Sequence, residues 1–311
     1  MSKVFIIHEN QEWSQPIQEE LAKLSVPVED WYLDSGAAPL FEEPPEGVFY
    51  NRMSASSHIR GHYYSPELTR SILLWLESYG RRVVNGVNAI RLEVDKVAQY
   101  SLLQRHGVRV PKTIAAVGVE KILEAGARME SPYILKPNRG GSGHQVKLIT
   151  QDGELEEYLR SDEYEDPRDG VWLLQQYIDP PGGGVYRAEF IGGKFLYTVR
   201  VDASDGFSLC PADPCQVDGG EESSEAASQN KFSIVDDFDD DPNIPLFEAV
   251  LADSGVEIAA FEFVPGEGGE LFVYDVNTNT NYNREAEQVV EKKGAAEIAR
   301  FLARVLREGE G

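Results

Sequence analysis

The sequence predicts an α/β protein, α+β in its later part, that begins with a small parallel α/β domain. Strand-like and helix-like patterns alternate over about the first 85 residues, which is typical of parallel sheets. Later strand patterns are joined by short glycine turns, which indicates antiparallel hairpins. The length of 311 residues corresponds to about two domains, or one large one, at roughly 150 residues each.

The N-terminal domain combines short apolar strands with amphipathic helices. Ser14 and Pro16 are typical of a helix start, and Pro66 and Gly80 bracket a second apolar-periodic stretch. Proline and acidic residues predict a loop over residues 36–47. We expect strands at residues 4–7, 26–33, 47–50 and 82–84, and helices at 15–24 and 66–79.

The rest of the chain is predicted to contain further strands, most of them paired with a neighbour in sequence. Gly192 and Gly193 predict a tight hairpin, and residues 217–231 have the composition of a mobile loop. We expect helices at residues 90–107, 152–161, 243–254 and 285–306, and strands at 132–137, 145–149, 171–178, 185–191, 194–202, 259–264 and 270–277.

The formal net charge is −24, because 29 basic residues face 53 acidic ones. This charge argues against nucleic acid and anionic membranes as partners. Two cysteines, Cys210 and Cys215, make neither a disulfide framework nor a four-thiolate zinc site. The first apolar run is too short for a signal peptide, so we expect a cytoplasmic protein.

A strand that carries Lys136 runs into a glycine-rich turn at residues 139–144. Successive glycines let backbone N–H groups surround phosphate oxygens, and a nearby lysine adds positive charge. The turn is not a P-loop, because a strand rather than a helix follows it. Taken alone, the pattern favours a plain hairpin loop.

Three oxygen-bearing side chains, Glu262, Asp275 and Asn277, lie within two strands that are predicted to be adjacent. Asp275 and Asn277 are two residues apart and therefore project from the same face. Magnesium prefers such hard oxygen ligands. The alternative is a surface position, but an unpaired charge inside an apolar strand would be costly. We therefore favour a metal site.

Cations also occur where strands or helices are predicted, at Lys96, Arg187 and Arg200. In so acidic a chain, these positions suggest contacts with an anion. Structural ion pairs are the alternative for each of them taken singly.

Taken together in order, these motifs resemble the ATP-grasp superfamily and are most similar to RimK-type carboxylate–amine ligases. The resemblance runs from about residue 47 to the C-terminus. It rests on the series Asp95-Lys96, Ile134-Leu135-Lys136-Pro137, the glycine-rich turn, Leu174-Gln175-Gln176-Tyr177-Ile178, Tyr186-Arg187-Ala188-Glu189, Glu262 and Asp275-Val276-Asn277. Residues 51–54 and 82–86 also resemble signatures of these ligases.

The resemblance implies an ATP-grasp fold in three parts: an N-terminal domain at residues 1–88, a central subdomain at 89–180 and a C-terminal subdomain at 181–311. It implies that Lys96 and Lys136 contact the phosphates of ATP. The turn of Gly140, Gly141, Ser142, Gly143 and His144 would fold over them. Gln176, Tyr177 and Ile178 would read the adenine, and Asp179 the ribose.

By the same resemblance, Arg187 and Arg200 lie near the transferred phosphoryl group. Glu262, Asp275 and Asn277 would bind Mg²⁺, with Mn²⁺ as an alternative. Arg52, Asn281 and Asn283 would contact the substrate. The segment after Asn277 lacks the Pro-Gly that is usual in these ligases, which indicates an unusual substrate.

The implied activity is an ATP-dependent ligase that joins amino acids or peptides through an acyl-phosphate and releases ADP and phosphate. Two alternatives remain open at this stage. One is an ATP-grasp kinase that phosphorylates a small-molecule hydroxyl, and the other is a non-catalytic nucleotide-binding regulator. A homodimer is an expectation from the family alone.

Overall fold

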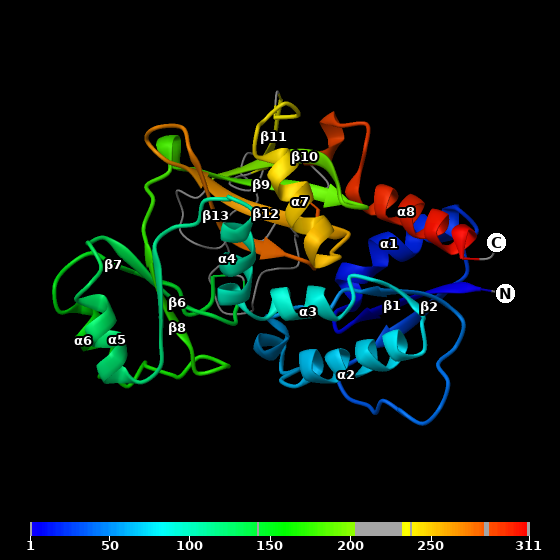
Figure 1. Ribbon diagram of the computed structural model, residues 1–311, viewed down its shortest axis with the longest axis horizontal. Coiled ribbons are helices and arrows are strands. Elements are labelled where there is room, and N and C mark those ends of the chain that lie inside the picture. Colours follow the sequence, from blue (N-terminus) through cyan, green and yellow to red (C-terminus); the bar gives the residue numbers. More distant parts are fainter. Residues whose placement is uncertain (1, 142, 203–231, 237, 283–285, 310–311) are drawn as a thin grey trace, which may run out of the picture.

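The computed structural model describes residues 2–141, 143–202, 232–236, 238–282 and 286–309. Over these ranges the chain forms one four-stranded parallel sheet, one four-stranded antiparallel sheet and one five-stranded antiparallel sheet. The sheets follow one another along the long axis of the molecule (Figure 1). The predicted α/β class with an N-terminal parallel domain is confirmed.

The N-terminal sheet has the strand order β2-β1-β3-β4, and all three pairings are parallel. Its strands are β1 (Lys3–His8), β2 (Val28–Tyr32), β3 (Gly47–Asn51) and β4 (Arg82–Val84). Helices α1 (Gln11–Lys23) and α2 (Ser65–Ser78) pack beside it, and a short 3-10 turn, η1 (Ser57–Arg60), follows β3. The carboxyl ends of β1 and β3 therefore lie at one edge, where ligands commonly bind.

Two predicted helices have different starts because polar caps decide where a helix begins. Helix α1 begins at Gln11 rather than residue 15, since the Asn10 side chain accepts a hydrogen bond from the Trp13 backbone N–H at 3.2 Å. The helix predicted over 90–107 is two helices, α3 (Val87–Glu93) and α4 (Lys96–Arg105). Asp95 separates them by capping α4, which places Lys96 at the first residue of that helix.

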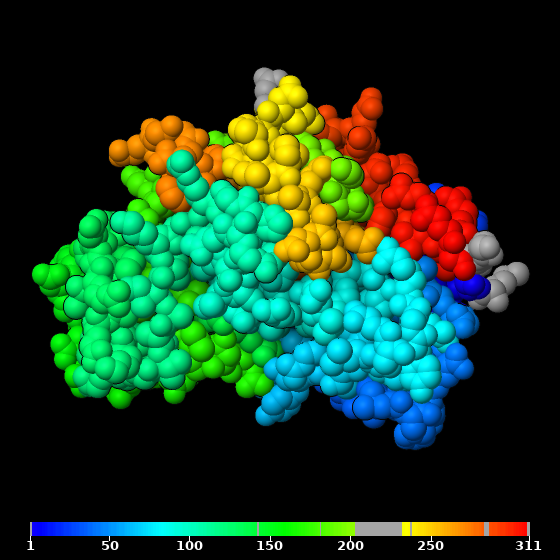
Figure 2. Space-filling view, in the orientation of Figure 1, coloured from blue at the N-terminus to red at the C-terminus, as the bar shows by residue number. Residues whose placement is uncertain are grey.

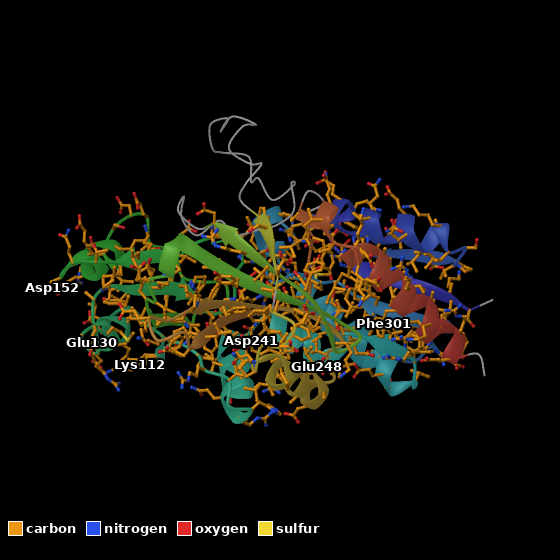
Figure 3. The ribbon with its side chains drawn as sticks, turned by 90° about the horizontal axis from the view of Figure 1, so that it is seen from above. Lys112, Glu130, Asp152, Asp241, Glu248 and Phe301 are labelled. Atoms are coloured by element: carbon orange, nitrogen blue, oxygen red, sulfur yellow. The ribbon has the colours of Figure 1, made fainter. Side chains whose placement is uncertain are left out.

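The central sheet has the order β5-β8-β6-β7, with antiparallel pairings throughout. Its strands are β5 (Thr113–Ala116), β6 (Tyr133–Pro137), β7 (Lys147–Ile149) and β8 (Trp172–Gln176), and its helices are α5 (Val119–Gly126) and α6 (Glu154–Leu159). Seen from above, Glu130 and Asp152 mark this end of the molecule, opposite Phe301 (Figure 3). The glycine-rich turn connects β6 to β7, as predicted.

The C-terminal sheet has the order β11-β10-β9-β12-β13. Its strands are β9 (Gly184–Ile191), β10 (Lys194–Asp202), β11 (Phe232–Val235), β12 (Ile258–Pro265) and β13 (Leu271–Asn277). A short 3-10 turn, η2 (Pro181–Gly183), precedes β9. Gly192 and Gly193 form the predicted hairpin with φ of +63° and +70°. Helices α4 and α7 (Ile244–Ser254) share a buried core with this sheet. The loop predicted at 217–231 lies outside the described residues.

The last helix, α8 (Gly294–Glu308), starts later than predicted and follows a 3-10 turn, η4 (Ala286–Val289). Its apolar face packs against α1 and strands of the first sheet, where Ile298 and Leu302 join Val4 and Val48 in one core. In Figures 1 and 2 the C-terminal segment accordingly lies beside the N-terminal one. The end of the chain thus shares the core of the N-terminal domain, while the predicted domain boundaries stay a prediction.

Within the described ranges, no helix combines the length and apolar character that crossing a membrane requires.

Candidate active site

A cavity of about 530 Å³ is lined by all three sheets or the segments that leave them. The N-terminal domain contributes Trp13 and residues 54–56. The predicted site residues that line the cavity are Lys96, Lys136, Gly140, Gly141, Gly143, His144, Gln176, Tyr177, Ile178, Asp179, Arg187, Glu262, Asp275, Asn277 and Asn281. Motifs that are up to 185 residues apart in the chain, from Lys96 to Asn281, therefore meet at one place.

Part of the cavity wall is apolar and is formed by the central and C-terminal sheets. Ile134 and Leu148 face it from β6 and β7, and Val185 and Val264 from β9 and β12. The segment after β8 runs along the same cavity, with Gln176 bonded through its side chain to the Lys112 backbone N–H at 3.3 Å. Such a slot suits a flat aromatic base. The sequence reasoning missed these apolar residues, because nothing distinguishes them from core positions.

Two lysines bring positive charge to the cavity from different elements. Lys96 Nζ lies 2.7 and 2.8 Å from the two carboxylate oxygens of Asp275. Lys136 Nζ donates to the Tyr274 carbonyl at 3.2 Å and lies 5.5 Å from the centre of the Tyr100 ring. Burial, followed by repulsion from Lys96, lowers the pKa of Lys136 to about 7. An anion bound between the two lysines would relieve this repulsion.

The glycine-rich turn rests against the N-terminal domain. A Cβ at Gly141 would lie 3.1 Å from Ser56 Cβ, so only glycine fits there without displacing the serine. Arg139 binds Glu67 through two hydrogen bonds of 2.6 and 3.3 Å. The rings of His144 and His58 stand 6.5 Å apart. Ser142 lies outside the described residues, so its predicted role stays a prediction.

The three predicted metal ligands come together. Strands β12 and β13 pair Glu262 with Asp275, and Asn277 Nδ2 donates to Glu262 Oε1 at 2.9 Å. This bond uses the amide nitrogen of Asn277, which leaves its side-chain oxygen Oδ1 for another partner. Among the described residues, no group of three or more His, Cys, Asp or Glu is suited to a metal, so the set has three donors only with Asn277.

The two carboxylates of this set are half-buried and close enough to repel each other. Burial raises the pKa of Glu262 to about 7 in spite of the Arg187 charge, and Asp275 adds to the rise. Burial also acts to raise the pKa of Asp275, but Lys96 and then Lys136 outweigh it and lower that pKa. Two carboxylates and one amide oxygen form the hard-oxygen donor set that fits Mg²⁺.

Arg187 approaches the same carboxylate from β9. Its Nη1 lies 3.1 Å from Glu262 Oε1, its Nε donates to Glu189 at 2.6 Å, and its Nη2 donates to the Thr280 hydroxyl at 2.7 Å. Arg187 is buried and lines the cavity. The guanidinium is therefore held on the side of the cavity that carries Glu262.

The predicted site residue Arg200 has different surroundings from Arg187. Arg200 lies outside the set of described residues that line the cavity, and its Nη2 donates to the Gly182 carbonyl at 2.8 Å. This placement does not support the predicted role at the phosphoryl group and connects β10 instead to the turn before β9.

Arg52 is only 3% exposed, and its donors bind the Trp13 carbonyl, the Thr280 carbonyl and the Asn281 side chain. It is not among the described residues that line the cavity, so its predicted contact with the substrate stays a prediction. Its guanidinium joins the N-terminal domain to the segment after β13. Asn281 does line the cavity, whereas Asn283 lies outside the described residues.

Asn85 and Glu93 also hold the segment after β13 in place. Asn85 donates to the carbonyls of Ile258 and Thr278 at 2.7 and 2.9 Å. Glu93 accepts from the Thr278 backbone N–H at 2.8 Å. Residues 82–86 carried a family signature in the sequence, but nothing there indicated that Asn85 holds two domains together.

Two of the curated proteins with similar sequences are named as ligases. The chain is 30% identical to alpha-aminoadipate–LysW ligase LysX of Sulfurisphaera tokodaii over 106 residues, which are 34% of this chain and 37% of that protein. It is 28% identical to tetrahydromethanopterin:alpha-L-glutamate ligase of Methanosarcina acetivorans over 203 residues, 60% of each chain. The chain thus spans less than two thirds of the curated relatives it matches. No protein-family model matches it.

Solved structures match over nearly the whole length. A RimK domain ATP-grasp protein from Sphaerobacter thermophilus superposes with a TM-score of 0.66 at 19% identity, covering 97% of this chain and 100% of that one. D-alanine–D-alanine ligase from Bacillus anthracis, complexed with ATP, gives a TM-score of 0.66 at 15% identity, covering 100% and 99%. At these identities the likeness establishes a shared fold, which is the ATP-grasp fold that the resemblance implied.

Proposed function

We propose that this chain, which has the ATP-grasp fold, is an ATP-dependent ligase that joins a carboxylate to an amine. One observation carries the proposal: a single cavity holds two lysines, a glycine-rich turn and two carboxylates with an amide oxygen. Two relatives with detectable sequence similarity are named as an alpha-aminoadipate–LysW ligase and a tetrahydromethanopterin:alpha-L-glutamate ligase. Because the chain spans only part of those relatives, their activity supports the proposal without fixing the substrates.

ATP is the nucleotide that the cavity suits. The base would occupy the apolar slot, where Tyr177 and Ile178 follow β8. The phosphates would lie between Lys96 and Lys136, under the glycine-rich turn. The similar D-alanine–D-alanine ligase was solved with ATP, which agrees with this assignment.

Glu262, Asp275 and Asn277 would hold Mg²⁺, or Mn²⁺ in its place. Bound there, the ion would neutralise charge on the phosphates of the nucleotide.

The proposed reaction has two steps. A substrate carboxylate oxygen attacks the terminal phosphorus of ATP, the bond from phosphorus to the bridging oxygen breaks, and ADP leaves. The amine then attacks the acyl carbon, phosphate departs with the former carboxylate oxygen, and one proton is released. Lys136 and Arg187 would position and neutralise the transferred group, which is the protein's main task in phosphoryl transfer.

The substrates would be amino acids or peptides. They would bind beyond the terminal phosphate, where Trp13, Ser54, Ser56 and Asn281 line the cavity. These side chains are neutral and offer hydrogen bonds and an aromatic ring. A screen of pairs from this class identifies the acid and the amine.

The test is a phosphate-release screen of amino-acid and dipeptide pairs with ATP and Mg²⁺, read together with mass spectrometry of the product. A ligase releases phosphate and ADP only when acid and amine are both present. ADP release with one acceptor and no phosphate would favour the kinase alternative. Nucleotide binding without turnover in any mixture would favour the regulator.

Variants locate the activity in the cavity. Asp275→Asn and Lys136→Met should each lower turnover by about 100-fold or more, since they remove charges that face the nucleotide. Lys194→Met is the matched control, because Lys194 is an exposed lysine that binds only Glu248 in the described structure. Equal turnover in all three variants would contradict the assignment of the site.

A further inference from the structure

Glu189 is a buried carboxylate within a β-strand. It lies near the middle of β9 and is only 2% exposed. Because residues two apart on a strand share a face, Glu189 and Arg187 project from β9 on the same side. On the other side of the strand, Ala188 and Phe190 enter the hydrophobic core with α7. An isolated charge at such a position would be costly, so its partners explain why it is there.

Each carboxylate oxygen of Glu189 accepts one hydrogen bond. Oε1 accepts from Arg187 Nε at 2.6 Å, and Oε2 accepts from the Thr280 hydroxyl at 2.7 Å. The same hydroxyl accepts from Arg187 Nη2 at 2.7 Å, which closes a ring of three side chains. Thr280 is fully buried, so water does not compete for these bonds.

The ring restricts the direction of the guanidinium. Glu189, Thr280 and Glu262 take three of the five N–H groups of Arg187, which leaves two N–H groups beyond this network. A planar guanidinium bonded on two adjacent edges has almost no freedom to rotate. Arg187 lines the cavity, whereas Glu189 and Thr280 do not.

Thr280 is itself held in place from the N-terminal domain. Arg52 Nη2 donates to the Thr280 carbonyl at 2.8 Å, and the same nitrogen donates to the Asn281 side chain. The Thr280 hydroxyl, which binds Arg187, therefore belongs to a residue whose backbone is held by Arg52 of the N-terminal domain.

We propose that Glu189 and Thr280 are positioning residues that aim Arg187 into the cavity, where it contacts the terminal phosphoryl group of ATP. The inference rests on the proposed function, because it assumes that the cavity binds ATP. Its consequence is selective: the two residues matter for the nucleotide that carries the terminal phosphate and not for ADP.

Binding measurements without substrate test this directly. A non-hydrolysable ATP analogue and ADP, each with Mg²⁺, are titrated by calorimetry into the wild type and the variants Arg187→Met, Glu189→Gln, Thr280→Val and Thr280→Ser. Thr280→Val removes the hydroxyl and keeps the shape, whereas Thr280→Ser keeps the hydroxyl. Thr198→Val is the control. Thr198 is a buried threonine on β10, in the sheet that contains Glu189, and its hydroxyl has no hydrogen-bond partner in the described structure.

We expect Arg187→Met, Glu189→Gln and Thr280→Val to lose about tenfold in affinity for the ATP analogue relative to ADP, the effect of one charge-assisted contact. Thr280→Ser and Thr198→Val should keep the wild-type ratio. If Glu189→Gln does not fold, the two Thr280 variants decide the question alone.

An unchanged ratio in Glu189→Gln and Thr280→Val, beside a lost ratio in Arg187→Met, overturns the positioning role and leaves the proposed function intact. An unchanged ratio in Arg187→Met overturns the inference through its premise. Failure of the wild type to bind either nucleotide overturns the proposed function, and the inference with it.

Discussion

At the scale of single residues, Lys136 has surroundings that oppose its own charge. Its side chain is buried, with 6% of the residue exposed, and its Nζ lies 5.5 and 5.8 Å from the ring centres of Tyr100 and Tyr274. Burial and the neighbouring Lys96 lower its pKa to about 7, although Asp275 and Glu262 act in the opposite direction. Without a ligand, the lysine is therefore about half protonated at neutral pH.

This pKa predicts that nucleotide binding is linked to proton uptake. Phosphate oxygens favour the protonated lysine, so its pKa rises when nucleotide binds, and the complex carries more protons than the free protein above pH 7. The affinity for ADP should then weaken by up to about tenfold per pH unit above pH 7. Calorimetry at pH 8 in buffers of different ionisation heat measures the uptake.

The control for this prediction is Lys136→Arg, because arginine stays charged throughout this range. Its ADP affinity should be nearly independent of pH between 7 and 9. A slope in Lys136→Arg as steep as that of the wild type would assign the pH dependence to another group.

At the scale of elements, the glycine-rich turn is joined to the N-terminal domain by Arg139 and Glu67. The Arg139 side chain is 8% exposed and that of Glu67 is 39% exposed, so solvent screens the pair in part. Glu67→Gln should therefore raise the KM for ATP by only about two- to fivefold, the range of a partly exposed ion pair.

Steady-state kinetics with varied ATP measure this effect. Glu156→Gln is the matched control, because Glu156 pairs with Arg160 on the exposed surface of α6. A rise in KM for both variants alike would trace the effect to net charge rather than to the turn.

Local sequence patterns predict most of these elements because the patterns reflect short-range chemistry. The strand with Lys136, its glycine-rich turn and the β9–β10 hairpin follow from alternation and turn residues. The break at Asp95 was missed, because an aspartate within a periodic run is either a cap or an exposed helix residue.

The partners of Arg52 were beyond local reasoning. Thr280 is 228 residues away, and only the assembled domains bring its carbonyl to the guanidinium. For the candidate site, the sequence motifs predict most of the polar residues that line the cavity. They do not distinguish Arg187, which lines it, from Arg200, which does not, because that difference depends on the tertiary structure.

At the scale of the whole molecule, Asn85 joins the first domain to the last sheet. Its side chain donates to two carbonyls and accepts from the backbone N–H groups of Glu257 and Ile258, both at 3.0 Å. Its φ of +57° suits asparagine better than most residues. Asn85→Ala should therefore lower the free energy of unfolding by about 2–4 kcal/mol.

Asn85→Gly separates the two causes, because glycine accepts the positive φ but lacks the amide. Urea unfolding should show a loss for Asn85→Gly that is large but smaller than that for Asn85→Ala. A loss below about 0.5 kcal/mol in both variants, the size of an ordinary surface substitution, would mean that this contact does not hold the domains together.

The net charge of −24 belongs to the whole chain, whereas Lys96, Lys136 and Arg187 line the cavity where we propose that the nucleotide binds. The central claim is that a substrate carboxylate attacks ATP there. The most direct measurement supplies amino acids and dipeptides labelled with ¹⁸O in their carboxylates, together with ATP and Mg²⁺, and analyses the released phosphate by mass spectrometry. An acyl-phosphate pathway predicts one ¹⁸O in each phosphate formed. Phosphate without ¹⁸O, whose fourth oxygen comes from water, would contradict the account.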